Sequence, residues 1–439
     1  MFSFFKTLKC CFFLLNMVFI LGTECGMYFL YGDYSLSIDR ITLRLASINI
    51  LYVKMFQAIA LNNKFIDETI NNKLLRFTDN VPWDYSDINL TDIVEISKKF
   101  DLTLRQGYEI PINSGMISLV FKAYKKNDVQ TPVILKIKRT NIEEKLNDAI
   151  DNLLFSLYVL SFIPIFDKIQ FVNLINENIE IVRHQTNFLE EIENMSRMKH
   201  NCRNLKYVKI PFSDREVTEQ FPNCILMEFI EGVKINQLKK EDCCDFAKQV
   251  VKFGVVTTLV HGVAHADLHS GNILFIKDTN DVKYPHKIGV IDFGIIHEID
   301  RLFKETLFNV FTPIFTSQPR ETAIKILNSG LIEPKNILQI IPKDDSENII
   351  DITTQMIDKT INVYKNANQM QMYNFFNQLT VYFSKPSMSN IGIKPSNQFV
   401  KCQMLLAMAH GVTLSLCDDD YVPIVDKVIN ELFHMDMIE

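Results

Sequence analysis

Residues suited to chemistry gather between positions 265 and 294 of the sequence. The stretch His265–Asn272 reads HADLHSGN, and Asp292 begins the tripeptide DFG. Magnesium prefers oxygen ligands and is commonly held by one or two carboxylates together with phosphate oxygens. Asp292 and Asn272 are therefore candidate ligands for Mg²⁺. Asp267, five residues before Asn272, is placed to orient or deprotonate an acceptor hydroxyl.

The order and spacing of these residues match the two catalytic segments of protein kinases, an HRDxxxxN loop followed by DFG. Either motif alone would carry little information. Here both occur in order, with β-rich runs at Ile273–Ile276 and Ile288–Ile291 between them. Phosphoryl transfer depends mainly on positioning and on neutralising charge. The segment therefore predicts ATP and Mg²⁺ as cofactors, and a nucleotide as a binding partner.

A second chemical element is Lys136, which ends the apolar run Val133–Lys136 (VILK). This run resembles the kinase strand whose lysine contacts the α- and β-phosphates of ATP. A lysine at a strand end is often only solvated, but a position ahead of a catalytic loop favours a catalytic role. Its partner should be a glutamate on a later predicted helix, where Glu190, Glu191 and Glu193 all occur. Spacing alone does not choose among these three.

The glycine-rich loop that normally precedes the lysine strand is reduced in this chain. Asn113–Ser118 reads NSGMIS and contains one glycine, Gly115. Its backbone could still approach phosphate, and the hydroxyl of Ser118 could donate a hydrogen bond. Glu228, in a predicted strand that ends at Phe229, is a further candidate contact of the nucleotide. No APE sequence follows the DFG tripeptide, so the usual platform for a peptide substrate is not indicated.

These motifs, with their departures, resemble the UbiB/ADCK-type atypical kinases, a protein-kinase-like family linked to coenzyme Q and other prenyl-lipid metabolism. The likeness covers residues 41–301. The family's KxGQ stretch is similar to Lys54–Gln57 (KMFQ), and its DFxxEAxN helix is similar to Asn187–Asn194. Its HADPHPGN loop is similar to His265–Asn272. Within that loop, His269 is shared with this family and not with ordinary kinases.

The resemblance implies particular roles. It selects Glu191 as the ion-pair partner of Lys136, and it makes Lys54 and Gln57 candidate contacts at the nucleotide site. In the family, the helical extension that carries KxGQ is thought to cover the place where a peptide substrate would dock. Phe56 stands in the position of the KxGQ glycine, and so bulky a residue is unfavourable for close packing of that extension.

The sequence predicts an α+β fold of the protein-kinase-like, bilobal kind, with a mixed sheet-and-helix small lobe, a mainly helical large lobe and an N-terminal helical extension. Strand-like runs come first, at Leu119–Tyr124 and Val133–Ile137, and helical patterns dominate after Glu241. Ser37–Asn80 reads as helical with few breakers. The predicted boundaries are a hydrophobic N-terminal segment at 1–36, the extension with its KxGQ-like motif at 37–106, the small lobe at 107–235 and the large lobe at 236–439.

The N-terminus carries the strongest hydrophobic signal in the chain. Lys6 and Lys9 precede the apolar run Cys10–Leu21, and a shorter run resumes at Met27. A spanning helix needs about 20 apolar residues, and Glu24 is unfavourable in such a span. Three alternatives remain open: a signal peptide, a membrane anchor, and a hydrophobic helix docked on the folded protein. We expect the protein to associate with a membrane through this segment.

The composition excludes several classes of protein. The chain has 439 residues, of which 47% are hydrophobic and 22% charged, as in globular proteins. A net charge of −6 does not indicate a nucleic-acid partner. The nine cysteines include no CxxC pair, so neither a zinc site nor a disulfide framework is predicted. Met404–Leu416 is shorter than a membrane span and is predicted to be a core helix.

The predicted function is that of an atypical kinase or ATPase that binds Mg-ATP and acts at a membrane, on lipids or on proteins of lipid metabolism. The presence of Lys136, Asp267, Asn272 and Asp292 favours chemistry. A nucleotide-binding pseudokinase scaffold is the main alternative, because the loop at Gly115 is reduced. A protein kinase acting on Ser or Thr is less favoured, because the APE sequence is missing.

Overall fold

The structure of the protein is a computed structural model that describes residues 4–54, 56, 73–74, 81–104, 110–126, 128–160, 183–311, 318–367, 372–390, 392–417, 424 and 427–428. The chain forms two compact units. The N-terminal unit comprises Met1–Arg197, Pro211–Ile230 and Asp292–Ile295, and the C-terminal unit comprises Met198–Ile210, Glu231–Ile291 and Ile296–Glu439. The DFG tripeptide therefore belongs to the N-terminal unit, whereas the HADLHSGN loop belongs to the C-terminal unit.

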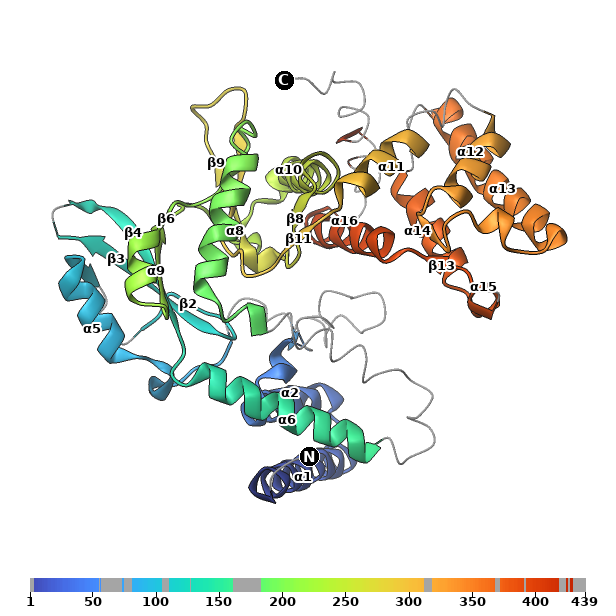
Figure 1. The fold of residues 1–439 in the computed structure, drawn as a ribbon. Helices are drawn as coiled ribbons and strands as arrows, with labels where there is room; N and C mark the ends of the chain where they lie inside the picture. The colour runs from blue at the N-terminus through green and yellow to red at the C-terminus, as the bar shows by residue number, and fades with distance from the viewer. Residues whose placement is uncertain are drawn as a thin grey trace. The chain divides into compact units, whose positions relative to one another are not determined.

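A six-stranded antiparallel sheet belongs to the N-terminal unit (Figure 1). Its strands pair in the order β1-β3-β4-β7-β6, with β2 added to β3. The bounds are β1 Leu102–Leu104, β2 Asn113–Ser114, β3 Ser118–Lys125, β4 Asp128–Lys138, β6 Ser213–Asp214 and β7 Cys224–Glu228. The predicted strands at 119–124, 133–137 and 224–229 are confirmed by β3, β4 and β7. These runs form strands because they are rich in the β-branched and aromatic residues that suit a sheet.

The register of β4 determines where its lysine points. Leu135 and Ile137 are buried in a core that isoleucines of α5 (Leu90–Lys99) also enter. Successive side chains of a strand point to opposite faces of the sheet. Lys136 therefore lies on the face away from this core, and the VILK run buries one side while it presents the lysine on the other.

Helices complete the N-terminal unit. They are α1 (Phe4–Tyr31), α2 (Tyr34–Ile48), the 3₁₀ turn η2 (Tyr85–Asp87), α5, α6 (Ile142–Leu160), α8 (Phe188–Asn201), which runs on into the C-terminal unit, and α9 (Arg215–Gln220). Figure 1 shows α1 lying alongside α2 and α6. The sequence predicts helices at 143–160 and 188–199, and α6 and α8 agree with them to within two residues at each end.

Polar contacts fasten α1 to both neighbouring helices. The Glu24 carboxylate, 6% exposed, pairs with Arg40 at 2.9 Å and with Arg44 at 2.8 Å on α2. Lys6 pairs with Asp151 of α6 at 2.7 Å. The segment from residue 5 to residue 31 is also long and apolar enough to cross a membrane, and only 22% of its most apolar 18-residue stretch is buried. In the structure this segment is a helix that packs against α2 and α6.

The predicted continuous helix Ser37–Asn80 is wrong at Asn49. Helix α2 ends at Ile48. The buried Asn49 side chain accepts a hydrogen bond from the Leu51 N–H at 2.9 Å and donates one to the Ala149 carbonyl of α6 at 3.0 Å. A side chain that bonds nearby backbone competes with the helix for those groups. The extension therefore turns at this residue.

The C-terminal unit contains small sheets. β5 (Val208–Lys209), β10 (His286–Val290) and β9 (Ile273–Lys277) form one sheet, and β8 (Val263–His265) pairs with β11 (Ile296–Glu298). The antiparallel β9–β10 pair confirms the strands predicted on either side of residue 280. The HADLHSGN loop runs from the end of β8 to the start of β9.

Helices predominate in this unit from residue 243 onward. They are α10 (Cys243–Val255), the π-helical η5 (Val256–His261), α11 (Arg301–Phe311), α12 (Pro319–Asn328), α13 (Lys343–Ala367), α14 (Met372–Phe383), α15 (Pro386–Asn390) and α16 (Asn397–Leu416), with β12 (Ile332–Glu333) paired to β13 (Lys394–Pro395). Helices α10 and α16 approach so closely that a Cβ at Gly254 would collide with Ala409. Glycine is thus required at this contact.

Helix α16 is longer than the predicted core helix Met404–Leu416. It begins at Asn397, after Ser396, whose hydroxyl accepts a hydrogen bond from the Phe399 N–H at 3.3 Å. The full helix is long and apolar enough to cross a membrane. The sequence prediction considered only Met404–Leu416 and therefore underestimated the length of the helix. Nearly half of its most apolar 18-residue stretch, 47%, is nevertheless buried, and a core helix of a folded unit can have the same length and composition.

We predict that replacing Asn49 with alanine destabilises the N-terminal unit. The change leaves the Ala149 carbonyl and the Leu51 N–H without their buried partner, which costs about 1–3 kcal/mol. Urea unfolding should therefore show a lower midpoint. Asn280→Ala, in an exposed turn, is the matched control and should unfold like the wild type. Equal midpoints for all three proteins would contradict the assigned role.

Candidate active site

A buried lysine links three segments of the N-terminal unit. β4 supplies Lys136, α8 supplies Glu191, and the returning segment Asp292–Ile295 supplies Asp292. The Lys136 ammonium lies 2.5 Å from Oε1 of Glu191 and 3.0 Å from Oδ2 of Asp292. The side chains of Lys136 and Glu191 are 9% and 2% exposed, whereas that of Asp292 is 33% exposed. Asp292 is thus the member of the group that a ligand can reach.

The α8 helix explains why Glu191, and not a neighbouring acid, faces the lysine. Glu191 lies on the buried face of the helix, among apolar residues. Glu190 instead contacts His184 at 3.1 Å, and Glu193 contacts Arg215 at 3.3 Å. The side chains of Glu190 and Glu193 are 39% and 57% exposed, so they lie on the solvent-facing side of the helix. The geometry therefore pairs the lysine with the glutamate that the family resemblance selects.

One positive charge between two carboxylates governs protonation in this group. Burial alone lowers the pKa of Lys136, but the negative charges of Asp292 and Glu191 outweigh it, so the net pKa is raised and the ammonium stays charged. Burial raises the pKa of Glu191 to about 7, against the opposing effect of the Lys136 charge. Repulsion from Asp292 adds to this rise. A cation bound at Asp292 would offset the excess negative charge.

The DFG segment is fastened to α8 and to its own aspartate. The Asn194 side-chain amide donates to the Phe293 carbonyl at 3.1 Å, and the Gly294 N–H donates to Oδ1 of Asp292 at 3.0 Å. Asn194 follows Glu191 by three residues, so both lie on the same face of α8. One helical turn therefore holds both the lysine and the DFG segment. This role of Asn194 was not predicted from the sequence, although its position three residues after Glu191 indicates that both side chains lie on the same face of the helix.

In the C-terminal unit, the HADLHSGN loop is built around its two histidines. Nδ1 of His265 accepts a hydrogen bond from the Asp267 N–H at 3.1 Å, and Nδ1 of His269 accepts one from the Gly271 N–H at 3.1 Å. Both rings are buried, so the histidines shape the turns of the loop. The Asn272 side-chain amide donates to the Asp267 carbonyl at 2.9 Å. This bond ties the two functional candidates of the loop together.

The donor atoms of these segments suit a magnesium ion. The bond from Asn272 to Asp267 uses the amide nitrogen, so the amide oxygen remains as a ligand of the type that Mg²⁺ prefers. Across the described ranges, no group of three or more His, Cys, Asp or Glu side chains comes together as a metal site. One carboxylate and one amide oxygen, completed by phosphate oxygens and water, form a usual Mg²⁺ set. Each of the two donors, within its own unit, is therefore of a type that Mg²⁺ accepts.

The reduced loop Asn113–Ser118 forms a tight turn between β2 and β3. The Gly115 N–H donates to the Ser118 carbonyl at 2.9 Å, which closes the turn. A Cβ at Gly115 would be in ordinary van der Waals contact with Ser118, the nearest atom at 3.5 Å, so packing does not require a glycine there. The Ser118 side chain is buried. Both candidate nucleotide contacts thus lie in one hairpin turn of the N-terminal unit.

The remaining sequence candidates lie elsewhere in the N-terminal unit. Glu228 ends β7, and its carboxylate accepts a backbone N–H at 3.3 Å. Lys54 is half-buried in the extension, and Gln57 lies outside the described residues. Phe56, in the place of the KxGQ glycine, is buried in a core and stacks on Tyr52, with 6.1 Å between ring centroids. The extension accommodates this bulky residue by burying it.

The structure thus brings the predicted site residues together in three separate groups. Lys136, Glu191 and Asp292 are in direct contact within the N-terminal unit. Asp267 and Asn272 are joined within the C-terminal unit. The third group is the turn with Gly115 and Ser118 described above. The catalytic, nucleotide-binding and metal-binding roles of all these residues remain predictions, as do the domain boundaries.

A lysine strand, a glutamate helix, a catalytic loop and a DFG segment, in this order, define a protein-kinase-like protein. Residues 77–325, more than half of the chain, match the family model for the ABC1 atypical kinase-like domain. The chain belongs to the ABC1 atypical kinase-like family. The predicted resemblance and the predicted fold class are both confirmed.

Several similar proteins carry kinase names. The chain is 26% identical over 242 residues to the protein ACTIVITY OF BC1 COMPLEX KINASE 8, chloroplastic, of Arabidopsis thaliana, a match that covers 53% of this chain and 30% of that protein. It is 23% identical over 357 residues to the probable serine/threonine-protein kinase abkB of Dictyostelium discoideum, covering 76% and 52%. It is 22% identical over 308 residues to the probable protein kinase UbiB of Shewanella baltica, covering 69% and 55%. The chain therefore spans only 30–55% of the length of these curated relatives.

We predict that Glu191 makes a pH-dependent contribution to stability. Its pKa is raised from 4.5 to about 7, so the folded protein binds a proton here more tightly than the unfolded chain does. The free energy of unfolding should therefore fall as pH rises from about 4.5 to 7, by at most about 3 kcal/mol from this group, and then level off.

The variant Glu191→Gln cannot titrate and isolates this effect. The difference in unfolding free energy between wild type and variant should decrease as pH rises from 5 to 7.5, and urea unfolding at several pH values measures it. All other titrating groups are common to the two proteins. Parallel pH profiles would show that Glu191 keeps an ordinary pKa.

Proposed function

We propose that the protein is an atypical kinase or ATPase that binds Mg-ATP and acts at a membrane, in lipid or quinone metabolism. The observation that carries this proposal is the buried contact of Lys136 with Glu191 and Asp292. A buried ion pair is weak evidence that a group of residues serves to stabilise the fold. Kinases use a lysine between two acids to position the lysine on phosphates and an aspartate on magnesium. The chain also carries Asp267 and Asn272 at the kinase spacing.

Each of these residues has a defined task in the proposal. Lys136, kept charged by its two carboxylates, contacts phosphate oxygens, and Glu191 holds the lysine in place. Asp292 and Asn272 would hold Mg²⁺, which when bound neutralises charge on the phosphates. Asp267 orients or deprotonates the acceptor hydroxyl.

Further contacts with the nucleotide are proposed from the turn and from the extension. Gly115 is half-buried in the turn between β2 and β3, and Ser118 adds a hydroxyl to the same turn. Glu228 lies at the end of β7. Lys54 and Gln57 of the KxGQ-like stretch are proposed to reach the nucleotide site, as the resemblance to the UbiB/ADCK type implies.

A lipid-linked reaction is better supported than phosphorylation of a peptide. No APE sequence follows Gly294, so the usual peptide platform of protein kinases is not indicated. The resemblance to the UbiB/ADCK type connects the proposed activity with prenyl lipids. Nucleic acid is not a proposed partner, since the net charge is −6.

We predict that Asp292→Asn abolishes magnesium-dependent nucleotide binding, with at least a hundredfold loss of affinity for Mg-ATP by calorimetry. A neutral amide cannot supply the carboxylate that Mg²⁺ prefers, while Lys136 keeps Glu191 as its partner. Asp281→Asn is the matched control, because Asp281 is 32% exposed and also pairs with a lysine, Lys287, at 2.9 Å. This control should bind Mg-ATP like the wild type.

Turnover of ATP, measured with and without liposomes, separates the two candidate functions. Equal Mg-ATP binding by wild type and Asp292→Asn would contradict the assignment of the site. Nucleotide-dependent thermal stabilisation without turnover, even with liposomes, would favour the pseudokinase scaffold. The observation that favours that alternative is the turn at Gly115, with its single glycine.

Helix α1 has two different apolar faces, and we propose that one of them contacts lipid. Five large side chains at spacings of three and four residues form an exposed stripe along one face: Phe5 78%, Leu8 59%, Phe12 72%, Leu15 69% and Phe19 62% exposed. The other face buries Phe13 and Ile20, and Glu24 fastens it to α2. A helix fixed to its neighbours in this way fits an orientation along the membrane surface, with the stripe among the lipids.

We predict that the double variant Phe12→Ser with Leu15→Ser binds vesicles at least tenfold more weakly than the wild type. Burying each of these side chains in an apolar environment contributes about 1.5–3 kcal/mol. Co-flotation with phosphatidylcholine vesicles measures the binding. Val282→Ser with Leu302→Ser, which removes two exposed apolar side chains of the C-terminal unit (93% and 68% exposed), is the control. Unchanged flotation of the α1 variant would contradict the lipid contact.

A further inference from the structure

A buried arginine lies behind the Gly115 turn in the N-terminal unit. Arg139 directly follows β4 and is 5% exposed. Its Nε and Nη2 both donate to the Gly115 carbonyl, at 3.1 and 2.8 Å, and Nη2 also donates to Oγ of Ser114 at 2.8 Å. The Arg139 backbone N–H donates to the Ile117 carbonyl at 2.9 Å. Arg139 thus holds the turn through three of its residues.

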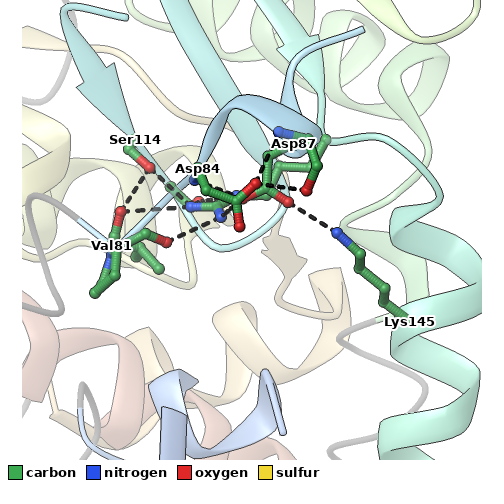
Figure 2. A network of polar contacts seen from close by, with 9 residues as sticks. Val81, Asp84, Asp87, Ser114 and Lys145 are labelled. Atoms are coloured by element: carbon green, nitrogen blue, oxygen red, sulfur yellow. Dashed lines mark hydrogen bonds and ion pairs between the residues drawn. The ribbon is translucent and has the colours of Figure 1, made fainter. Parts of the chain in front are cut away.

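The same guanidinium reaches the segment Val81–Asp87, which belongs to the predicted extension. Nη1 donates to the Pro82 carbonyl at 3.0 Å and to Oδ2 of Asp87 at 2.7 Å. The segment also contacts the turn directly. The Val81 N–H donates to the Ser114 carbonyl at 2.9 Å, and the Ser114 hydroxyl donates to the Val81 carbonyl at 2.7 Å. Figure 2 shows Val81 and Ser114 together at one side of this network.

Asp87 and Lys145 close the other side of the network, at the edge of a cavity of about 550 Å³. Oδ1 of Asp87 accepts a hydrogen bond from the Lys145 ammonium at 2.8 Å (Figure 2). Asp87 is 9% exposed and Lys145 is 46% exposed. Solvent screens the contact of a half-exposed lysine. Removing the buried arginine takes away the donor of the Gly115 and Pro82 carbonyls and leaves the buried Asp87 carboxylate to the screened Lys145 and a backbone N–H. Arg139 is therefore the group on which the network depends.

The contact with the Gly115 carbonyl also determines the direction of the next amide. In a trans peptide, the C=O and the N–H that follows it point in opposite directions. Because the Gly115 carbonyl faces Arg139, the Met116 N–H is turned away from Arg139. Backbone N–H groups of a turn can bind phosphate, and the Met116 N–H is the one whose direction this contact determines.

We propose that Arg139 is a positioning residue that orients the Gly115 turn for nucleotide phosphates and couples this turn to the segment Val81–Asp87. The inference rests on the proposed nucleotide-binding function. Lysine cannot replace arginine here, because an ammonium is a compact point charge and cannot bridge the turn and Asp87 at the same time. Nucleotide binding at the turn and order in Val81–Asp87 stabilise each other, since coupling between two sites is reciprocal.

The first test is amide hydrogen exchange in the full chain without nucleotide. In Arg139→Lys, the Gly115 N–H should exchange at least tenfold faster than in the wild type. The amides of Phe121 and Leu135 inside the sheet should keep their protection, which verifies that the variant is folded. Lys145→Met is the matched control and should leave exchange at Gly115 unchanged. Ser114→Ala removes one acceptor of the same guanidinium and should change exchange in the same direction to a smaller extent.

The second test adds Mg-ATP to the same proteins. Arg139→Lys should bind Mg-ATP roughly tenfold or more weakly, within the usual range of coupling between sites, while Lys145→Met binds it like the wild type. In the wild type, Mg-ATP should slow exchange of the Val81 N–H, and in Arg139→Lys this effect should disappear. A purely structural role of Arg139 would lower stability without removing this nucleotide-dependent protection of Val81.

The outcomes distinguish this inference from the proposed function. Wild-type exchange at Gly115 in both Arg139→Lys and Ser114→Ala overturns the inference. Faster exchange with unchanged affinity for Mg-ATP overturns the coupling, and the inference with it. If the wild type itself binds no Mg-ATP, the proposed nucleotide-binding function fails, and with it the orientation for phosphates. The exchange experiment without nucleotide then still decides whether Arg139 holds the turn.

Discussion

The positive charge of Lys136 is the constraint on which much of the N-terminal unit depends. A buried ammonium requires carboxylate partners, and its two partners come from segments far apart in the chain, Glu191 from α8 and Asp292 from the DFG segment. β4, α8 and the DFG segment must therefore converge. Helical spacing then brings Asn194 to the same place, where it holds the Phe293 carbonyl. A single charged side chain thus determines the relative positions of three elements.

The end of β4 performs two tasks with two cations. Lys136 lies within the strand, so the alternation of the sheet directs it away from the apolar core. Arg139 lies just past the strand, where the chain is free to turn, and its guanidinium faces the Gly115 turn. The Lys136 ammonium is a compact charge that contacts two carboxylates. Arg139 instead donates to several acceptors at once, for which a planar guanidinium is suited. The two residue types therefore match their different surroundings.

The chemical motifs and most of the strands could be predicted from the sequence, because both depend on local order and spacing. The core strands could be predicted from their β-rich runs alone. The HADLHSGN and DFG segments could be predicted from their residue types and spacing. Features that depend on tertiary contacts were missed. Asn49 breaks a helical pattern by bonding Ala149 across a hundred positions of the chain, and Arg139 resembles any charged residue after a strand until the turn and Val81–Asp87 fold against it. Spacing in the sequence did not decide which of three glutamates pairs with Lys136. In the structure only Glu191 is buried, and it is the one that contacts the lysine.

The charge of the lysine group bears on whether the protein performs chemistry or only binds nucleotide. Lys136 carries one positive charge against two carboxylates, and the resulting excess of negative charge contributes to the raised pKa of Glu191. A polyanionic nucleotide would be repelled by such a group unless a cation accompanied it. In a scaffold that bound nucleotide without a metal, the charge of Asp292 would repel the phosphates. The accessible carboxylate beside the lysine therefore supports the proposed metal-dependent nucleotide site, which is the arrangement that phosphoryl transfer requires.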